Sequence, residues 1–342
     1  WPALWRETIE SIVIAFVLAF LFRTFEAEAF VIPTGSMAPT LMGRHKDLLC
    51  EKCGYPFRVS ASDEMDSKTN TRSSQLVVGC TCPMCRYTMD VSPDNPQGKT
   101  YRSYKGDRIL VGKFPYQYRD PKRWEVTVFK YPGGAKTNFI KRIVGLPNET
   151  LRIAHGDIFT KKEGEDDFSI EQKPAAKAKA MLQVVYDNDY ARGVDDGLGK
   201  LLDLGWPARW SGPSLGENPG GWKTTDHVSF QTDGSAEDTA WLEYRHIVPS
   251  HEDWDYLDQG QLPPGAPRNN PRLISDFCGY NTNISSPSLY TFDAGRRPRP
   301  SADKMGLHWV GDLAVECEVE IEGNTGQVLF DLIEGGKHFL CT

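Results

Sequence analysis

The sequence lacks an excess of positive charge and has only one long hydrophobic run. Its 39 Lys and Arg residues are outnumbered by 46 Asp and Glu residues, which gives a formal net charge of −7. This balance excludes a general basic surface for nucleic acid, and no stretch interleaves basic and aromatic residues densely enough to predict a local one. No convincing small-residue cleavage site follows the hydrophobic run, as it would in a secretory leader. We therefore expect no nucleic-acid partner, and a hydrophobic segment that is retained.

The overall composition points to a β-rich chain with more than one domain. With 342 residues, of which 39% are hydrophobic, the chain can bury a sizeable core. The 31 Gly, 23 Pro and 11% aromatic residues suit a turn-rich β architecture better than a helical bundle. The expected fold class is therefore mainly β.

The hydrophobic run extends from Ile12 to Phe22. At about eleven residues it is short for a membrane span, but its flanks are typical of one. Counted from Trp5 to Phe25, a helix at about 1.5 Å per residue is roughly 30 Å long, close to the hydrocarbon thickness of a bilayer. Glu7 and Glu10 would then lie at the headgroup end, since a carboxylate in hydrocarbon is costly. We predict that residues 1–29 form a membrane anchor helix and linker.

Four cysteines form the strongest compositional pattern. They make two Cys-x-x-Cys pairs, at Cys50, Cys53, Cys82 and Cys85. Four thiolates at this spacing suit a tetrahedral zinc ion, and a closed four-sulfur site is structural rather than catalytic. Two disulfides are the alternative in an oxidising compartment. Cys80 either replaces Cys82 as a ligand or remains free. The pattern predicts that residues 50–104 form a zinc ribbon.

Two further residues stand in unusual positions. Ser36 lies between Gly35 and Met37 in a turn that Pro39 closes, which is a geometry that exposes a hydroxyl. An ordinary turn serine is the alternative. Lys141 stands in the middle of an apolar strand pattern, where burial would disfavour the cation and leave a neutral amine able to act as a general base. The alternative is an edge-strand lysine that faces solvent.

The segments around these two residues resemble the type I signal peptidases, which are membrane-anchored Ser/Lys endopeptidases that remove signal peptides from exported preproteins. The family's Ser-Gly-Ser-Met-x-Pro-Thr-Leu block carries the nucleophile and matches Thr34 to Leu41, with Ser36 at the nucleophile position. The family's Lys-Arg-x-x-Gly-Leu-Pro-Gly block carries the general base and matches Lys141 to Asn148, where Asn148 replaces the last Gly. A hydroxyl two residues before the nucleophile donates to the oxyanion in this family, and Thr34 stands at that position.

The resemblance implies a β-barrel catalytic core, formed here by residues 30–49 and 105–153. It implies a single-pass protein of the cytoplasmic membrane, with the catalytic domain on the extracytoplasmic face. The partners would be preprotein signal peptides and the lipid bilayer, and acyl transfer would need no catalytic cofactor. The alternative is a catalytically inactive, membrane-tethered binding scaffold of the same family.

The chain also departs from the family pattern. A zinc ribbon between the two core segments is not usual in the family. The final family block, Gly-Asp-Asn…Ser-x-Asp-Ser-Arg, is not found, and Gly311-Asp312 is a two-residue echo of it. We expect this block to lie beyond Thr342 in a longer protein, and the alternative is lost activity.

The remaining sequence resembles nothing as specific. Residues 154–205 are predicted to be a partly helical spacer, because Ala and Leu are frequent from Ala175 to Leu182. Residues 206–342 show strand patterns separated by turn residues, with a hairpin turn expected at Glu322 to Gly326, and predict a β-sandwich that is truncated. It is distantly similar to concanavalin-like sandwiches, which implies an unknown ligand, and an inert spacer is the alternative. The expected strands are residues 227–232, 240–245, 309–321 and 327–332.

Overall fold

The computed structural model describes most of the chain. The described residues are 2–21, 23–24, 27–66, 69, 71–134, 137–212, 221–265, 271–286, 298–323 and 326–342. The chain divides into two compact units, and it passes between them several times. Unit 1 comprises Trp1–Lys46, Ser60–Gln75 and Arg102–Gln183, and unit 2 comprises Asp47–Val59, Leu76–Tyr101 and Val184–Thr342.

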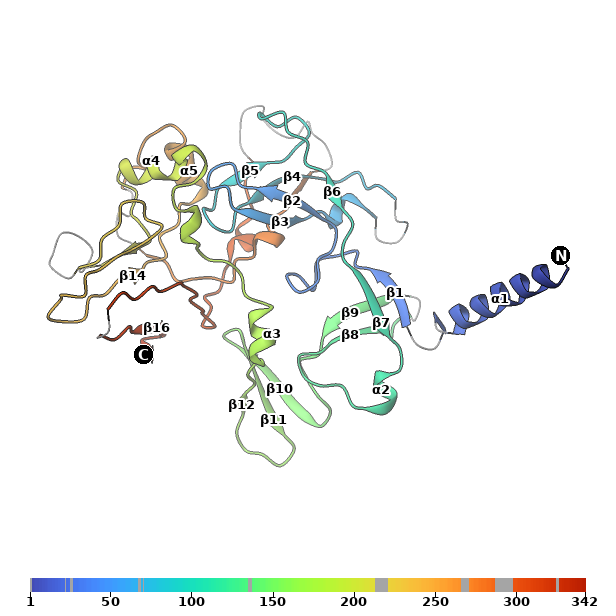
Figure 1. The fold of residues 1–342 in the computed structure, drawn as a ribbon. Coiled ribbons are helices and arrows are strands. Elements are labelled where there is room, and N and C mark those ends of the chain that lie inside the picture. Colours follow the sequence, from blue (N-terminus) through green and yellow to red (C-terminus); the bar gives the residue numbers. More distant parts are fainter. Residues whose placement is uncertain are drawn as a thin grey trace. The chain divides into compact units, whose positions relative to one another are not determined.

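Unit 1 contains the N-terminal helix and most of the longer hairpins (Figure 1). Strand β1 pairs with β7, β8 with β9, and β11 lies between β10 and β12, all antiparallel. The elements are α1 (Pro2–Leu21), β1 (Ala27–Val31), β6 (Ser103–Tyr104), β7 (Arg108–Gly112), α2 (Pro115–Tyr118), β8 (Val126–Lys130), β9 (Asn138–Arg142), β10 (Glu149–Ala154), β11 (Asp157–Lys162), β12 (Ser169–Ile170), α3 (Ala175–Lys179) and the 3-10 helix η2 (Ser62–Glu64). Strands β2 (His45–Leu49) and β3 (Pro56–Ser60) carry the chain from one unit to the other.

The hairpins of unit 1 follow from local sequence. In the β8–β9 hairpin Phe129 lies opposite Phe139, and their rings stack with centroids 6.2 Å apart. Such aromatic pairs stabilise a two-stranded ladder. The β10–β11 turn places His155 and Gly156 at φ values of 53° and 88°, as a tight hairpin turn requires. Turn chemistry and cross-strand pairs therefore account for both hairpins.

Unit 2 is built from short elements. Its sheets are β15-β4-β5, β13-β14 and β16-β17. The elements are β4 (Leu76–Thr81), β5 (Thr88–Asp90), α4 (Gly197–Asp203), β13 (Trp210–Ser211), β14 (Glu243–Tyr244), α5 (His251–Leu257), β15 (Ile284–Ser286), β16 (Phe330–Glu334), β17 (Lys337–Cys341) and the 3-10 helices η3 (Asn188–Tyr190), η4 (Val194–Asp196), η5 (Gly279–Asn281) and η7 (Ala302–Met305). Helix α5 begins with a capping box between Ser250 and Asp253.

The mainly β fold class is confirmed, but two finer predictions are not. In the described residues the strands of residues 30–49 and 105–153 form separate small sheets rather than one closed barrel. The predicted β-sandwich over 206–342 is wrong for the described part of that segment, where the sheets are two-stranded apart from β15-β4-β5. Residues 310–321 form no strand, because alternation alone supplies no partner for their backbone groups. The hairpin turn expected at Glu322 to Gly326 lies partly outside the described residues.

Helix α1 forms where the sequence predicts a helix, and its apolar side chains are exposed. Phe16 and Phe20 have exposed fractions of 73% and 68%. Within the described residues, however, none of the helices combines the length and the apolar character that crossing a bilayer requires. The predicted membrane anchor is therefore not confirmed.

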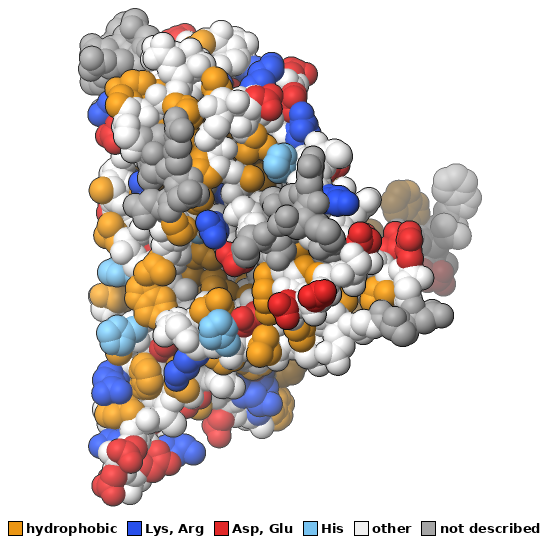
Figure 2. Space-filling view, turned by 90° about the vertical axis from the view of Figure 1, so that its left-hand side faces the viewer, with side chains coloured by type: hydrophobic (Ala, Val, Ile, Leu, Met, Phe, Trp, Pro, Cys, Tyr) orange, Lys and Arg blue, Asp and Glu red, His pale blue; other side chains and the backbone are white. Residues whose placement is uncertain are grey.

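The four cysteines are among the most deeply buried side chains of unit 2. Cys50, Cys53, Cys82 and Cys85 are each at most 3% exposed, and Trp254 beside them is 2% exposed. On the face drawn in Figure 2, charged side chains of both signs are interspersed among hydrophobic ones.

Candidate active site

A loop between β1 and β2 carries Ser36, and Asp107 closes it at its base. The Ile32 N–H donates to the backbone oxygen of Asp107 at 2.9 Å, and the Asp107 N–H donates to the backbone oxygen of Met42 at 2.9 Å. The Met42 N–H in turn donates to Oδ2 of Asp107 at 2.7 Å. One residue therefore holds both ends of the loop.

Within the loop, hydroxyl and apolar side chains point to different environments. Met37 is 6% exposed and Ile32 is 3% exposed, whereas Ser36 and Thr34 are exposed. The Ala38 N–H donates to the Gly35 oxygen at 2.9 Å and forms a turn around Ser36. Burial of its neighbour Met37 thus fixes the orientation in which Ser36 presents its Oγ to solvent.

Two glycines allow the close approach of backbone at the base of the loop. A Cβ at Gly43 would overlap the backbone of Thr34 and Gly35. A Cβ at Gly106 would overlap the backbone oxygen of Ile32. Any side chain at either position would therefore displace the loop.

Strand β9 brings Lys141 to this loop. Lys141 lies opposite Thr127 of β8, and its Nζ donates to Oγ of Ser36 at 2.8 Å. The two residues are 105 positions apart in sequence. The structure thus places the two side chains that the sequence singled out in direct contact.

Of the two interpretations of Lys141, the structure supports the exposed strand lysine, and the buried one is wrong. The residue is exposed, because in the described residues β9 pairs only with β8 and the Lys141 side chain reaches an exposed serine.

The neighbouring Arg142 also contacts the loop, which the sequence reasoning missed. Its Nη2 donates to Oγ1 of Thr40 at 3.1 Å, and its Nη1 donates to the backbone oxygen of Trp124 at 2.9 Å. Two consecutive residues of β9 therefore form hydrogen bonds with the loop, Lys141 with Ser36 and Arg142 with Thr40. Arg142 belongs to the Lys-Arg block, and that membership was the available sequence signal.

Asn148 occupies the position at which the family block has Gly, and its backbone explains the exchange. Its φ is 61°, a left-handed conformation that Asn adopts more readily than other residues with a Cβ. Glu149 follows it and binds Arg123 with both carboxylate oxygens at 2.7 Å. The Arg123 guanidinium holds the pKa of Glu149 below its usual range. The turn after β9 is thus fixed by backbone conformation and by a paired carboxylate.

We predict that Asp107→Ala slows cleavage of a peptide substrate by about tenfold, since an unanchored loop lets Ser36 leave its position. Asp107→Asn keeps an oxygen acceptor for the Met42 N–H and is the matched control. Steady-state kinetics of both variants, with thermal unfolding measured in parallel, checks this. An Ala variant as fast as the unchanged chain would show that Asp107 does not position Ser36.

We predict that Asn148→Val destabilises the protein, whereas Asn148→Gly does not. Glycine adopts positive φ without strain and should leave the free energy of unfolding unchanged or raise it slightly. Valine at φ 61° should lower it by about 1–3 kcal/mol. Denaturant unfolding of both variants provides the measurement, and equal stabilities would contradict the left-handed conformation.

The four predicted cysteines form one buried cluster in unit 2. Their Sγ atoms lie within 4.8 Å of one another, with Cys50 to Cys85 at 3.4 Å and Cys53 to Cys82 at 3.5 Å. Cys50, Cys53, Cys82 and Cys85 are all free thiols, so the disulfide alternative for these four is wrong. Cys80 is buried outside the cluster. Hydrogen bonding from Cys53 holds the pKa of the Cys50 thiol well below its usual range, whereas burial raises the pKa of Cys85.

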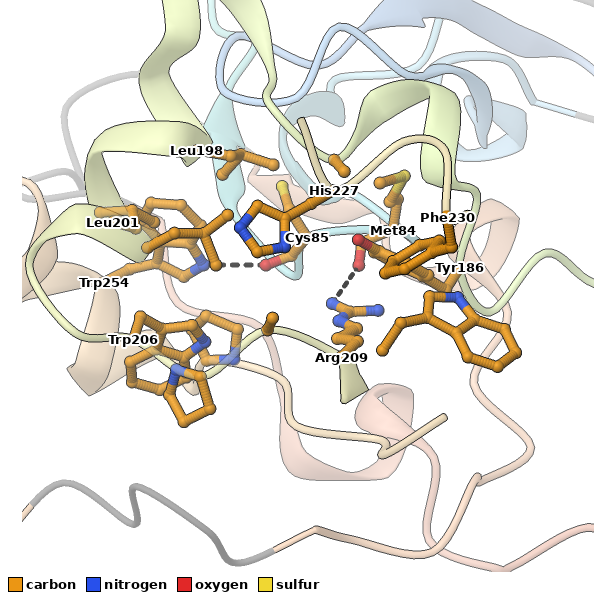
Figure 3. A pocket seen from close by; sticks show the side chains of 16 residues that line it. Met84, Cys85, Tyr186, Leu198, Leu201, Trp206, Arg209, His227, Phe230 and Trp254 are labelled. Carbon is orange, nitrogen blue, oxygen red and sulfur yellow. Dashed lines mark hydrogen bonds between the residues drawn. The ribbon is translucent and has the colours of Figure 1, made fainter. Parts of the chain in front are cut away.

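Distant segments of unit 2 bind the backbone of the two cysteine pairs. The Val194 N–H donates to the Lys52 oxygen at 2.9 Å. Nε1 of Trp254 donates to the Cys85 oxygen at 3.0 Å, and Arg209 Nη2 donates to the Met84 oxygen at 2.6 Å. Figure 3 shows the last two bonds, at the edge of a cavity of about 60 Å³. Its lining is mainly aromatic and aliphatic and includes Met84, Cys85, Tyr186, Leu198, Leu201, Trp206, Arg209, His227, Phe230 and Trp254.

Comparison with known proteins identifies one family. A family model described as "Signal peptidase, peptidase S26" matches residues 5–78 and 94–193. The matched ranges include Ser36 and Lys141, and they pass over residues 79–93, which hold Cys82 and Cys85. No solved structure matches the chain.

Curated relatives carry the same description. The probable signal peptidase I-2 of Synechocystis is 26% identical over 176 residues, which cover 50% of this chain and 52% of that protein. The signal peptidase I of Pseudomonas aeruginosa is 46% identical over 59 residues, 14% of this chain and 21% of that protein. That of Buchnera aphidicola is 29% identical over 99 residues, 25% of this chain and 31% of that protein. The chain thus spans about half of the length of the first relative and less of the other two.

Proposed function

Because the chain belongs to the signal peptidase family, peptidase S26, we propose that it is a serine endopeptidase that removes signal peptides from exported preproteins. The observation that carries the proposal is the hydrogen bond from Lys141 Nζ to Ser36 Oγ at 2.8 Å. A serine in contact with an amine base is the arrangement that acyl transfer requires. The relatives that match the chain are named signal peptidase I, which supports this substrate class.

In the proposed mechanism, Lys141 acts as the general base and Ser36 as the nucleophile. Neutral Lys141 takes the proton from Ser36 Oγ, which attacks the scissile carbonyl carbon and forms an acyl-enzyme. The Ser36 N–H and the Thr34 hydroxyl donate to the oxyanion. Lys141 then protonates the leaving amine, and water hydrolyses the ester. Since both side chains are exposed, a bound substrate would cover them and exclude bulk water from the reaction.

We propose the lipid bilayer as a second partner, with α1 at the cytoplasmic membrane and the catalytic residues on its extracytoplasmic face. The exposed apolar side chains of α1 support this, among them Ile9, Phe16 and Phe20. In the same unit, Leu110 of β7 is 68% exposed, and Tyr118 at the end of α2 is 81% exposed. Aromatic and aliphatic side chains of this kind suit a membrane interface. A bilayer would present the cleavage site of a preprotein close to Ser36.

We also propose that the cysteine cluster holds a structural zinc ion. Tetrahedral zinc with Zn–S bonds of about 2.3 Å separates its sulfurs by about 3.8 Å. Two of the Sγ–Sγ distances are 3.4 and 3.5 Å, and all four Sγ atoms lie within 4.8 Å of one another. These distances fit the tetrahedral geometry. Burial of all four thiols fits a closed, non-catalytic site.

The test of the peptidase proposal is cleavage of a purified preprotein reconstituted in lipid vesicles, with the new N-terminus identified by mass spectrometry. Ser36→Ala should abolish cleavage while thermal unfolding stays unchanged. Cleavage by the variant at the unchanged rate would overturn the assignment. A folded chain without activity before and after substitution would favour a non-catalytic scaffold.

A further inference from the structure

The two cysteine pairs form nearly identical backbone loops, with one exception in residue type. In the first, the Gly54 N–H donates to the Cys50 oxygen at 2.9 Å, and the Cys50 N–H donates to the Tyr55 oxygen at 3.0 Å. In the second, the Arg86 N–H donates to the Cys82 oxygen at 3.1 Å, and the Cys82 N–H donates to the Tyr87 oxygen at 2.9 Å. Arg86 therefore stands where the first loop has Gly54.

This position favours glycine. The φ of Gly54 is 75° and that of Arg86 is 63°, in the left-handed region where a Cβ is strained. An arginine in this conformation lowers the stability of the fold relative to glycine. Its presence therefore indicates that the arginine side chain has a function of its own.

The Arg86 guanidinium is buried beside the cluster without a carboxylate. Arg86 is 7% exposed, its Cζ lies 3.3 Å from the centroid of the Phe277 ring, and its Nη1 is buried without a hydrogen-bond partner among the described residues. No ion pair in the described part of the chain includes it. Arg86 directly follows Cys85, so its side chain extends from the same loop that carries Cys82 and Cys85.

A second buried guanidinium binds the same loop. Arg209 is 8% exposed, and it donates to the backbone oxygens of Met84 and Val185 while its Cζ lies 4.6 Å from the Tyr186 ring centroid (Figure 3). It too forms no ion pair within the described residues, and it repels Arg86. Two buried cations in one place are costly unless an anion compensates them.

We propose that Arg86 and Arg209 are the built-in counter-charges of a divalent metal held by four thiolates. Four thiolates and one divalent cation carry a net charge of −2, and the two guanidiniums carry +2, so the buried centre is electrically balanced. The inference rests on the proposed zinc site. It adds that Arg86 retains its strained conformation because its charge stabilises the metal-loaded cluster.

The test compares zinc affinity among three substitutions of Arg86 in the full chain. Arg86→Gly relieves the backbone and copies the first loop, Arg86→Met keeps much of the side-chain volume, and Arg86→Lys keeps the charge. Competition with a chromophoric zinc chelator should give affinities about tenfold or more weaker for the Gly and Met variants, because a nearby buried charge is lost. The Lys variant should lie between these and the unchanged chain. Arg58→Met removes an exposed arginine of the same unit and should change nothing.

The outcomes separate the inference from the zinc proposal. An unchanged chain that contains no metal would overturn the zinc site itself. A chain that binds zinc and loses none of its affinity in Arg86→Gly and Arg86→Met would overturn the role of Arg86 alone. Inorganic phosphate offers a further check. Phosphate that raises the thermal stability of the unchanged chain but not of Arg86→Met would assign Arg86 to a soluble anion and overturn the inference.

Discussion

Lys141→Met is expected to lower the rate of preprotein cleavage by about 10³-fold or more. Methionine is similar in length to lysine but cannot accept a proton from Ser36, to which Lys141 now donates a hydrogen bond at 2.8 Å. Because Lys141 is exposed, the substitution removes no buried ion pair and should leave the unfolding temperature unchanged. Single-turnover cleavage measured beside thermal unfolding checks both statements.

The control is Lys130→Met, which removes an exposed lysine from β8 of the same hairpin. It should leave cleavage within about twofold of the unchanged chain, since exposed substitutions far from chemistry have small effects. The double variant Ser36→Ala, Lys141→Met should be no slower than Ser36→Ala alone, because a nucleophile and its base act as a unit. Additive losses would contradict a shared proton-transfer step, and an active Lys141→Met variant would remove Lys141 from the mechanism.

The sequence predicted which residues form the candidate site better than it predicted how buried they are and what they contact. Motifs located Ser36 and Lys141, and the structure joins them. The sequence left open whether Lys141 is buried or exposed, because strand alternation does not say whether a second layer covers a face. The roles of Asp107 and Arg142 were not predicted, because each residue contacts the loop through a hydrogen bond to a residue far away in sequence. The separations are 65 positions for Asp107 and 102 for Arg142.

In the fold, too, features set by neighbouring residues could be predicted from the sequence, and features set by contacts between distant residues could not. Both strands of the β8–β9 hairpin have alternating β-branched and aromatic residues, and they pair with each other along the chain. Residues 310–321 have a similar alternation and form no strand, since a strand also needs a partner that the pattern does not specify. Cysteine spacing identified the four thiols that form the cluster, whereas the hydrogen bond from Trp254 to Cys85 spans 169 positions and has no local signature.

Cys85→Ser is expected to unfold much of unit 2, because the cluster supports the segments that bind its backbone. Apparent binding energies of structural zinc are about 10–16 kcal/mol, which exceeds the stability of most domains. Loss of one thiolate should therefore lower the unfolding temperature strongly and release Trp254, whose Nε1 donates to the Cys85 oxygen. Tryptophan emission should shift to the red, and zinc measured by elemental analysis should fall from one equivalent toward none.

Removal of zinc from the unchanged chain with a strong chelator should reproduce this result, and added zinc should reverse it. Cys317→Ser is the matched control, since this thiol is exposed and lies outside the cluster. It should retain one equivalent of zinc and the unfolding temperature of the unchanged chain. If the chelator and Cys85→Ser both leave emission and unfolding unchanged, the four thiols pack without a metal and the distant segments fold independently of one.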